Sequence, residues 1–196
     1  MIVVHVSGTP GTGKTFFGKR LEELFSQGNA VAKVVETDEL ITAISPYGIK
    51  LEALKNSDRE KYKSCWAIIF KGEIDAAIER EKNKGTSLVV LVGILRHWEP
   101  NDGTILEIPE AEVKLYLDLS LEQLLKRFYG RYSEDLGNEK EFWCGVASDR
   151  YIIPKSTTVR ENYYSDKKWH EEHDYQIVTD GDAFEKIKWL YSKLIK

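Results

Sequence analysis

The sequence predicts an α/β fold in which one parallel sheet carries helices on both of its faces. Three observations predict it. Short apolar segments alternate with longer amphipathic segments from one end of the chain to the other. A glycine-rich turn joins the first apolar segment, residues 2–6, to the first amphipathic segment. The segment from Leu88 to Val92 is continuously apolar, as expected for a strand that is buried on both faces of a parallel sheet.

The glycine-rich turn, residues 8–15, reads G-x-x-x-x-G-K-T, a pattern typical of phosphate-binding loops. Glycines let backbone N–H groups turn inward around a phosphate, and the following helix adds the positive end of its dipole. Lys14 is expected to reach the β- and γ-phosphates, and the Thr15 hydroxyl is expected to coordinate magnesium. The predicted nucleotide-binding residues are Gly8, Pro10, Gly11, Thr12, Gly13, Lys14, Thr15 and Phe16.

Composition limits the class of protein. A chain of 196 residues with 42% hydrophobic and 31% charged residues fits one globular domain. The net charge of −4 argues against a protein that coats nucleic acid. Cys65 and Cys144 lack metal-ligand spacing, which favours two buried thiols in a reducing compartment. No apolar segment is long enough to span a membrane, so a cytoplasmic location without membrane partners is expected.

A second strand is predicted over residues 30–35, and Glu36-Thr37-Asp38 stands at its carboxyl end. In extended chain, Glu36 and Asp38 would point to the same side. Ligands bind at the ends of parallel strands, so a carboxylate here could hold a magnesium-bound water or accept a proton from an acceptor hydroxyl. The alternative is that Asp38 only caps a helix over residues 39–44. Both roles can coexist.

The middle of the chain predicts a long helix and the central strand. The helix, from Arg59 to Lys84, has an apolar stripe that is expected to face the core. The strand over residues 88–92 leads into Gly93. An acid at the end of such a strand often helps to place magnesium, but here that position is Val92.

The last third predicts two more strands, over residues 113–119 and 175–178. A helix after the first of them, capped by Ser120 with Gln123, carries Arg127 and Arg131 on one face. Like charges placed together repel, so an anion is expected to bring them together. Phosphate is the natural candidate, because Arg matches its oxygens with paired donors. The alternative is a solvated surface face. Residues 132–172 are interpreted as a lid and not as a second domain.

Several segments resemble the adenylate kinase and nucleoside monophosphate kinase group of P-loop kinases. They are VHVSGTPGTGKTFFGKRL, TDELITAI, LVVLVGILR, LDLSLEQLLKRFYGR and, more faintly, STTVRENYY. The resemblance implies a P-loop NTPase three-layer sandwich with a five-stranded parallel sheet in the order 2-3-1-4-5. It also implies a single domain over residues 1–196, with an acceptor flap at about 39–60 and a helical lid at about 127–160.

The resemblance further implies ATP and magnesium as cofactors. Lys14 would stabilise the transferred phosphoryl group, and Arg96 would hold the phosphate of the acceptor substrate. Arg127 and Arg131 would close with the lid onto the phosphates as catalytic residues. Such transfer depends on positioning and charge neutralisation, and a closed lid would exclude water.

Three positions depart from this family's pattern. Val92 replaces its Asp, Pro100 its Gln and Ile41 its Arg. Glu-Thr-Asp also resembles the D-x-D strand end of shikimate kinase-like enzymes, in which the first acid helps to place magnesium and the second contacts an acceptor hydroxyl. That resemblance makes Glu36 a metal candidate together with Thr15, and makes Asp38 a candidate for substrate contact and for the catalytic base.

Three functions remain open from the sequence. The first is transfer of the γ-phosphate of ATP to a nucleoside monophosphate. The second is phosphorylation of a hydroxyl on a small metabolite, a nucleoside or a polynucleotide 5′ end, with Asp38 as base. The third is a nucleotide-binding protein or slow ATPase without an acceptor. The expected partners are nucleotides and a small-molecule acceptor, with no nucleic acid beyond that 5′ end.

Overall fold

The computed structural model describes residues 1–9, 11–43, 53–54, 56–93, 111–127, 174–179 and 183–195. Its strands are β1 (Ile2–Ser7), β2 (Ala32–Glu36), β3 (Leu88–Val92), β4 (Val113–Asp118) and β5 (Tyr175–Val178). Its labelled helices are α1 (Lys14–Gln27), α2 (Thr37–Ala43), α4 (Arg59–Asn83) and α8 (Ala183–Leu194). A further helix covers residues 121–127.

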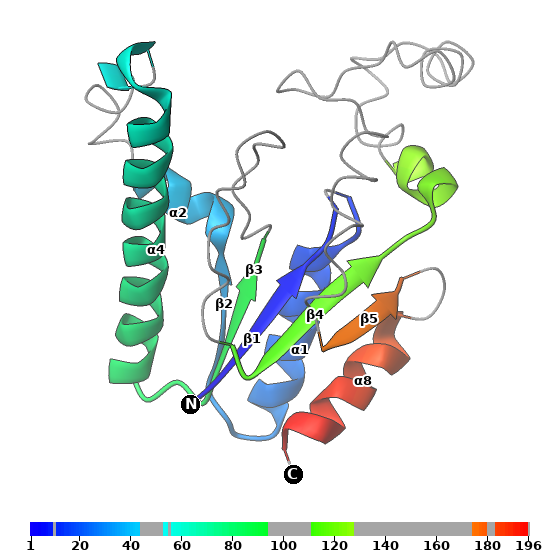
Figure 1. Ribbon diagram of the computed structural model, residues 1–196. Coiled ribbons are helices and arrows are strands. Elements are labelled where there is room, and N and C mark those ends of the chain that lie inside the picture. Colours follow the sequence, from blue (N-terminus) through cyan, green and yellow to red (C-terminus); the bar gives the residue numbers. More distant parts are fainter. Residues whose placement is uncertain are drawn as a thin grey trace.

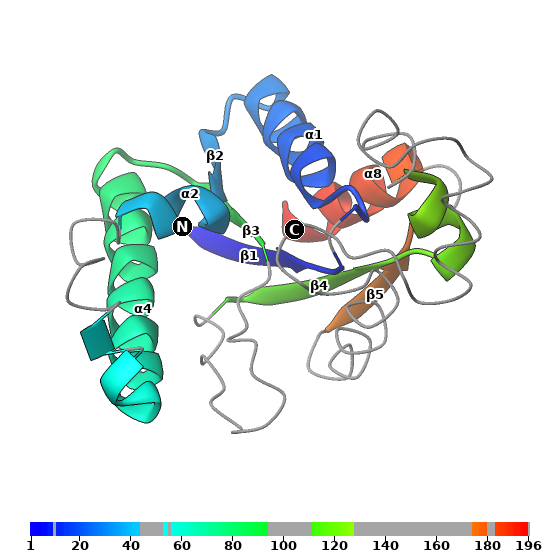
Figure 2. The same ribbon diagram turned by 90° about the horizontal axis from the view of Figure 1, so that it is seen from above.

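The five strands form one sheet in the order β2-β3-β1-β4-β5, and every neighbouring pair is parallel. The predicted fold class and strand order are therefore confirmed. Helices α1 and α8 lie together on one face of the sheet, and α4 covers the other (Figures 1 and 2). The carboxyl ends of all five strands consequently meet at one edge of the sheet, the upper edge in Figure 1.

Each face of the sheet has its own apolar core. Under α1 and α8, side chains such as Phe17, Leu21 and Ile187 pack on alternate residues of the strands. Under α4, Phe70 and Ile74 pack on the intervening residues. The predicted stripe of α4 is therefore core, because a central parallel strand presents apolar side chains to both faces.

Helix α1 approaches β3 closely at Gly18. A Cβ at this position would lie 2.7 Å from Val92 Cγ2, which is too short for a real contact. Gly18 thus lets the second turn of α1 pack directly on the carboxyl end of β3. This packing fixes the position of α1, and with it the glycine loop, relative to the carboxyl ends of the strands.

The start of the second helix differs from the prediction. Helix α2 begins at Thr37, directly after β2, and not at Glu39. The buried Thr37 hydroxyl donates a hydrogen bond to Val92 O at 3.2 Å, which turns the chain as soon as the strand ends. Asp38 therefore lies in the first turn of α2. The expectation that Glu36 and Asp38 continue one extended strand was wrong.

Other boundaries agree with the sequence. Helix α4 and strands β3 and β5 lie within one residue of their predicted ranges, and Ser120 Oγ accepts a hydrogen bond from Gln123 N at 3.3 Å, as a capping residue does. Cys65 is half-buried, whereas Cys144 lies outside the described residues. In the part of the chain that is described, every helix is too short or too polar to cross a membrane.

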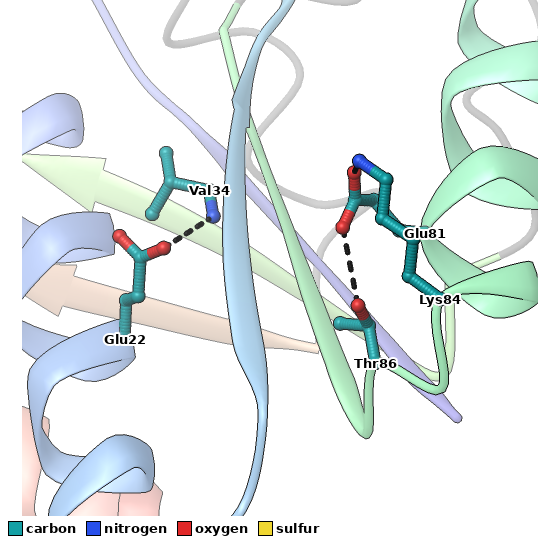
Figure 3. Close-up of polar contacts among 5 residues, drawn as sticks. All are labelled: Glu22, Val34, Glu81, Lys84 and Thr86. Carbon is teal, nitrogen blue, oxygen red and sulfur yellow. Dashed lines mark hydrogen bonds and ion pairs between the residues drawn. The ribbon is translucent and has the colours of Figure 1, made fainter.

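Polar contacts also join helices α1 and α4 to the sheet and to the turn before β3 (Figure 3). Glu22 on α1 accepts a hydrogen bond from Val34 N on the edge strand β2 at 3.4 Å. Between α4 and β3, Glu81 accepts hydrogen bonds from Lys84 Nζ at 2.6 Å and from Thr86 Oγ1 at 3.1 Å. The Glu81 contacts lie just before the amino end of β3, so they stabilise the fold away from the carboxyl ends of the strands.

The Glu81 cluster predicts a pH dependence of stability. The hydrogen bond from Lys84 holds the pKa of the Glu81 carboxyl below its ordinary value of 4.5, against the opposing effect of burial and with help from Thr86. A carboxyl whose pKa is lower in the folded state contributes stability above the unfolded pKa and loses it as pH falls through the folded pKa. We expect Glu81→Gln to reduce the loss of Tm on acidification from about pH 6 to about pH 3.

The matched control is Glu79→Gln, which removes an exposed carboxylate that pairs with Lys82 at 2.9 Å on the same helix. Exposed pairs contribute little to stability, so this variant should follow the wild-type Tm profile. A Glu81→Gln profile parallel to that of the wild type would contradict the prediction.

Candidate functional site

The glycine loop lies at the carboxyl end of β1, where the backbone takes conformations that only glycine adopts readily. Gly8 has φ of +139°, and a Cβ there would lie 2.5 Å from Leu117 O on β4. The loop is thus pressed against the neighbouring strand at its first residue. Within the loop, Thr12 closes a turn by donating from both its backbone N and its Oγ1 to Thr9 O, at 3.2 and 2.9 Å.

The amino end of α1 is open toward the loop. Gly13, the residue before the helix, has φ of +93° and offers no side-chain cap. The first turn of α1 contains no acidic residue. The first N–H groups of a helix have no partner within the helix, and they carry partial positive charge. This helix end therefore provides donors for an anion at the position that the sequence predicted.

The Lys14 side chain folds back over the loop. Its Nζ donates to Gly8 O at 2.7 Å and to Thr9 O at 3.2 Å. Two backbone carbonyls therefore hold an ammonium group beside the open end of α1. A compact positive charge fixed in this way can neutralise a phosphate that the loop binds.

Thr15 and Glu36 bring two oxygen ligands together next to Lys14. Thr15 Oγ1 donates to Glu36 Oε2 at 3.2 Å, which joins the first turn of α1 to the end of β2. Lys19, one turn further along α1, lies 3.7 Å from Glu36 Oε1 and balances its charge. Glu36 is therefore oriented from two sides by residues of a single helix.

Strand register places the Glu36 carboxylate next to Val92, the position at which the sequence lacks an acid for magnesium. Glu36 on β2 is the direct partner of Val92 on β3. Partners on neighbouring strands lie about 4.8 Å apart and point to the same face. Both side chains face α1, since Val34 and Val90, two residues before them, pack in the core beneath that helix. A carboxylate therefore lies at the same end of the sheet as Val92, on the neighbouring strand.

Thr15 and Glu36 fit magnesium by their chemistry. Magnesium takes oxygen ligands and usually keeps several waters, so one or two protein ligands together with substrate phosphates suffice. Within the described residues, no group of three or more His, Cys, Asp or Glu side chains could hold a metal ion. The pair would hold magnesium only together with a bound phosphate, and the ion would neutralise phosphate charge there.

Arg127 reaches the loop from the helix over residues 121–127. Its Nη1 donates to Gly11 O at 3.2 Å, although most of the residue is exposed. The structure therefore brings Arg127 to the predicted site. Pro10, Arg96 and Arg131, also predicted there, lie outside the described residues, as do part of the predicted flap and nearly all of the predicted lid, so their roles stay predictions.

Two further predicted residues lie at the rim of the site. Asp38 is exposed in the first turn of α2, two residues beyond Glu36. Phe16 is 54% exposed at the start of α1, and the guanidinium carbon of Arg20 lies 5.5 Å from the centre of its ring. Neither side chain is buried in the core, so both remain accessible to a ligand.

Three residues at this edge were missed in the sequence. Thr37 and Thr179 are buried hydroxyl residues that directly follow β2 and β5. Lys19 follows Thr15 by four residues, so it lies on the same face of α1. The signals were available, because a threonine after an apolar strand and an i, i+4 spacing are both visible in the sequence.

Comparisons with known proteins agree with this geometry. The sequence model of the AAA_18 family, described as an AAA domain, matches residues 4–143. A search of curated proteins finds no match. Among solved structures, the chain resembles several shikimate kinases, and the likeness extends over nearly their whole length.

The shikimate kinase from Bacteroides thetaiotaomicron is 12% identical with a TM-score of 0.54, and the alignment covers 100% of this chain and 99% of that one. The enzyme from Aquifex aeolicus is 13% identical with a TM-score of 0.51, covering 99% and 96%. The enzyme from Acinetobacter baumannii, in complex with shikimate, is 17% identical with a TM-score of 0.53, covering 100% and 93%. At these identities the likeness concerns the fold alone.

Proposed function

Because this chain belongs to the AAA_18 family of AAA domains, a P-loop family whose membership implies nucleotide binding, we propose that it is an ATP- and magnesium-dependent phosphotransferase. One observation carries the proposal. Lys14 is held over the glycine loop while Thr15 contacts Glu36 beside it. An ammonium group and a pair of oxygen ligands thus adjoin one phosphate site, and such charge neutralisation is most of what phosphoryl transfer requires.

The acceptor that we favour is a hydroxyl of a small molecule. The contact between Thr15 and Glu36 supports this choice, because it gives the first acid of Glu-Thr-Asp the position of a metal ligand. Asp38 then remains as an exposed carboxylate at the same edge, available to accept the proton of a hydroxyl. The fold likeness to shikimate kinases, one of them in complex with shikimate, is consistent with such an acceptor.

A nucleoside monophosphate is the second candidate acceptor. Arg127 favours it, since the sequence places this residue in the R-x-x-x-R pattern of the monophosphate kinases and the structure brings it to the loop. In that case Arg96 would hold the acceptor phosphate, and Asp38 would only stabilise the first turn of helix α2. The two candidates share the glycine loop and differ at the acceptor.

The test is an acceptor screen with ATP labelled at the γ-phosphate. It should offer shikimate and other small alcohols, nucleosides, ribo- and deoxyribonucleoside monophosphates, and a 5′-hydroxyl oligonucleotide. Label in a hydroxyl compound supports our first choice, and label in a monophosphate supports the second. Phosphate release that no acceptor changes would overturn both choices and indicate a slow ATPase.

Glu36 gives a prediction about the metal. We expect Glu36→Gln to raise the magnesium concentration needed for half-maximal ATP binding or turnover by about 10- to 100-fold, because an amide is a much weaker ligand than a carboxylate. Titration of ATP binding with magnesium, or of the variant with Mn²⁺ followed by electron paramagnetic resonance, measures this requirement.

The strand register offers a rescue experiment. Since Val92 is the direct partner of Glu36, Val92→Asp in the Glu36→Gln background returns a carboxylate to the same edge and face. We expect this double variant to need less magnesium than Glu36→Gln alone. Wild-type magnesium dependence in Glu36→Gln would show that Glu36 takes no part in metal binding.

A further inference from the structure

A buried threonine at the end of the last strand contacts the glycine loop from the sheet side. Thr179 is 5% exposed, and its Oγ1 lies 3.3 Å from Thr12 O in the loop and 3.0 Å from Asp118 O at the end of β4. Its backbone N also donates to Asp118 O at 2.8 Å. One hydroxyl, whose single proton is shared between the two carbonyl oxygens, therefore connects β4, β5 and the loop.

The frame behind Thr179 is itself fixed. Asp118 Oδ2 accepts a hydrogen bond from Gln176 Nε2 at 2.7 Å, and its Oδ1 accepts one from Leu119 N at 2.9 Å. The backbone of Thr179 is therefore held by its own N–H bond to Asp118 O, and not only by its side chain. Loss of the hydroxyl should release Thr12 O while leaving this frame in place.

The contact with Thr12 O has a consequence for the next N–H group. The Thr12–Gly13 peptide is trans, so its C=O and N–H point in opposite directions. A hydroxyl that holds Thr12 O on the sheet side leaves the Gly13 N–H directed away from the sheet. That N–H belongs to the residue that starts the open end of α1.

We propose that Thr179 is a positioning residue of the phosphate site, which orients the Thr12–Gly13 peptide so that the Gly13 N–H faces a bound phosphate. The inference rests on the proposed function only in that the loop binds polyphosphate. It links the end of β5, on one side of the sheet, to the affinity of the loop. It requires no particular acceptor and no transfer step.

The test compares Thr179→Val with Thr179→Ser in the full chain. Valine keeps the shape and removes the donor, so affinity for inorganic tripolyphosphate and for ATP should fall by about three- to tenfold, the range expected for one hydrogen bond. Serine keeps the hydroxyl and should restore wild-type affinity. Thr179→Cys, of similar size with a weak donor, should lie between them, and it replaces the valine variant if that one does not fold.

The matched control is Thr86→Val. Thr86 is 4% exposed and its Oγ1 donates to Glu81 at 3.1 Å, so the variant loses an equally buried hydroxyl hydrogen bond on the far side of the fold (Figure 3). We expect it to lose Tm as Thr179→Val does but to bind tripolyphosphate as the wild type does. Equal weakening in both variants would make the effect one of general stability and would overturn the proposal.

A second readout reports on the N–H itself. In ¹⁵N-labelled protein, tripolyphosphate should shift the Gly13 amide resonance strongly in the wild type and in Thr179→Ser, and less in Thr179→Val. The proposal would be overturned if Thr179→Val bound tripolyphosphate with wild-type affinity and showed the same Gly13 shift as the wild type. If the variants change tripolyphosphate binding as expected but the wild type phosphorylates no acceptor, the proposed function is overturned and this inference still stands.

Discussion

Replacing Lys14 with methionine is expected to lower kcat/KM for ATP-dependent transfer by about 10²- to 10³-fold, the loss typical of removing one fixed donor from a site of developing charge. Methionine has a similar length and can pack along the loop, but it carries no charge. The ammonium group is held by Gly8 O and Thr9 O, so it is already in place before phosphate arrives. Such preorganisation gives it more effect than a mobile surface charge would have.

The measurement is initial-rate kinetics with the acceptor that the labelled-ATP screen identifies, together with ATP binding by calorimetry. Lys82→Met is the control, because Lys82 is an exposed lysine on α4 that pairs with Glu79 at 2.9 Å. It should leave both kinetics and binding unchanged. Transfer by Lys14→Met at the wild-type rate would show that the loop does not hold the phosphate that is transferred.

The phosphate loop could be predicted because its contacts are local. Lys14 folds back on Gly8 and Thr9, only six and five residues before it, so one short motif specifies the whole arrangement. The alternation of apolar segments likewise specified the strands, since each is continuous in the sequence. The strand order came from the resemblance to P-loop kinases, and the pairing of the five strands confirms it.

The roles of two of the missed residues, Thr37 and Thr179, depend on contacts between distant parts of the chain. Thr179 and Thr12 are 167 residues apart, and Thr37 and Val92 are 55 apart. A threonine after a strand has many uses, and only the folded sheet shows which carbonyl it reaches. The same holds for the start of α2, because the bond from Thr37 to Val92 O ends the extended conformation that the Glu-Thr-Asp spacing suggested.

That early start of α2 changes the argument for Asp38 without removing it. Gly93, which follows β3, has φ of +151°, and a Cβ there would clash with Thr37 Oγ1. The chain at Thr37 is therefore packed tightly against the end of β3, and this contact fixes where α2 begins. Asp38 is held one residue later by a rigid junction and not by a loose loop. A catalytic carboxylate benefits from such support, because misplacement of a proton acceptor costs rate.

We expect Asp38→Asn to lower kcat for transfer to a hydroxyl acceptor by about 10²-fold or more, which is the contribution of a general base. Asparagine keeps the shape and removes one exposed charge from the first turn of α2, so α2 and the Tm should change little. ATP binding should also persist, because Asp38 lies in α2 and not in the glycine loop. The expected signature is therefore a loss in kcat with nearly unchanged affinity for ATP, measured by steady-state kinetics and calorimetry.

Glu39→Gln supplies the matched control, since Glu39 is the other acidic residue in the first turn of α2 and is also exposed. Successive helical residues point about 100° apart, so the two carboxylates cannot both face one acceptor. If Asp38→Asn retains activity while Arg96→Ala abolishes phosphorylation of a nucleoside monophosphate, then the acceptor is bound by its phosphate and Asp38 is only part of the first turn of α2. If Asp38→Asn and Glu39→Gln lose equal activity, the cause is the charge of the helix terminus and not proton transfer.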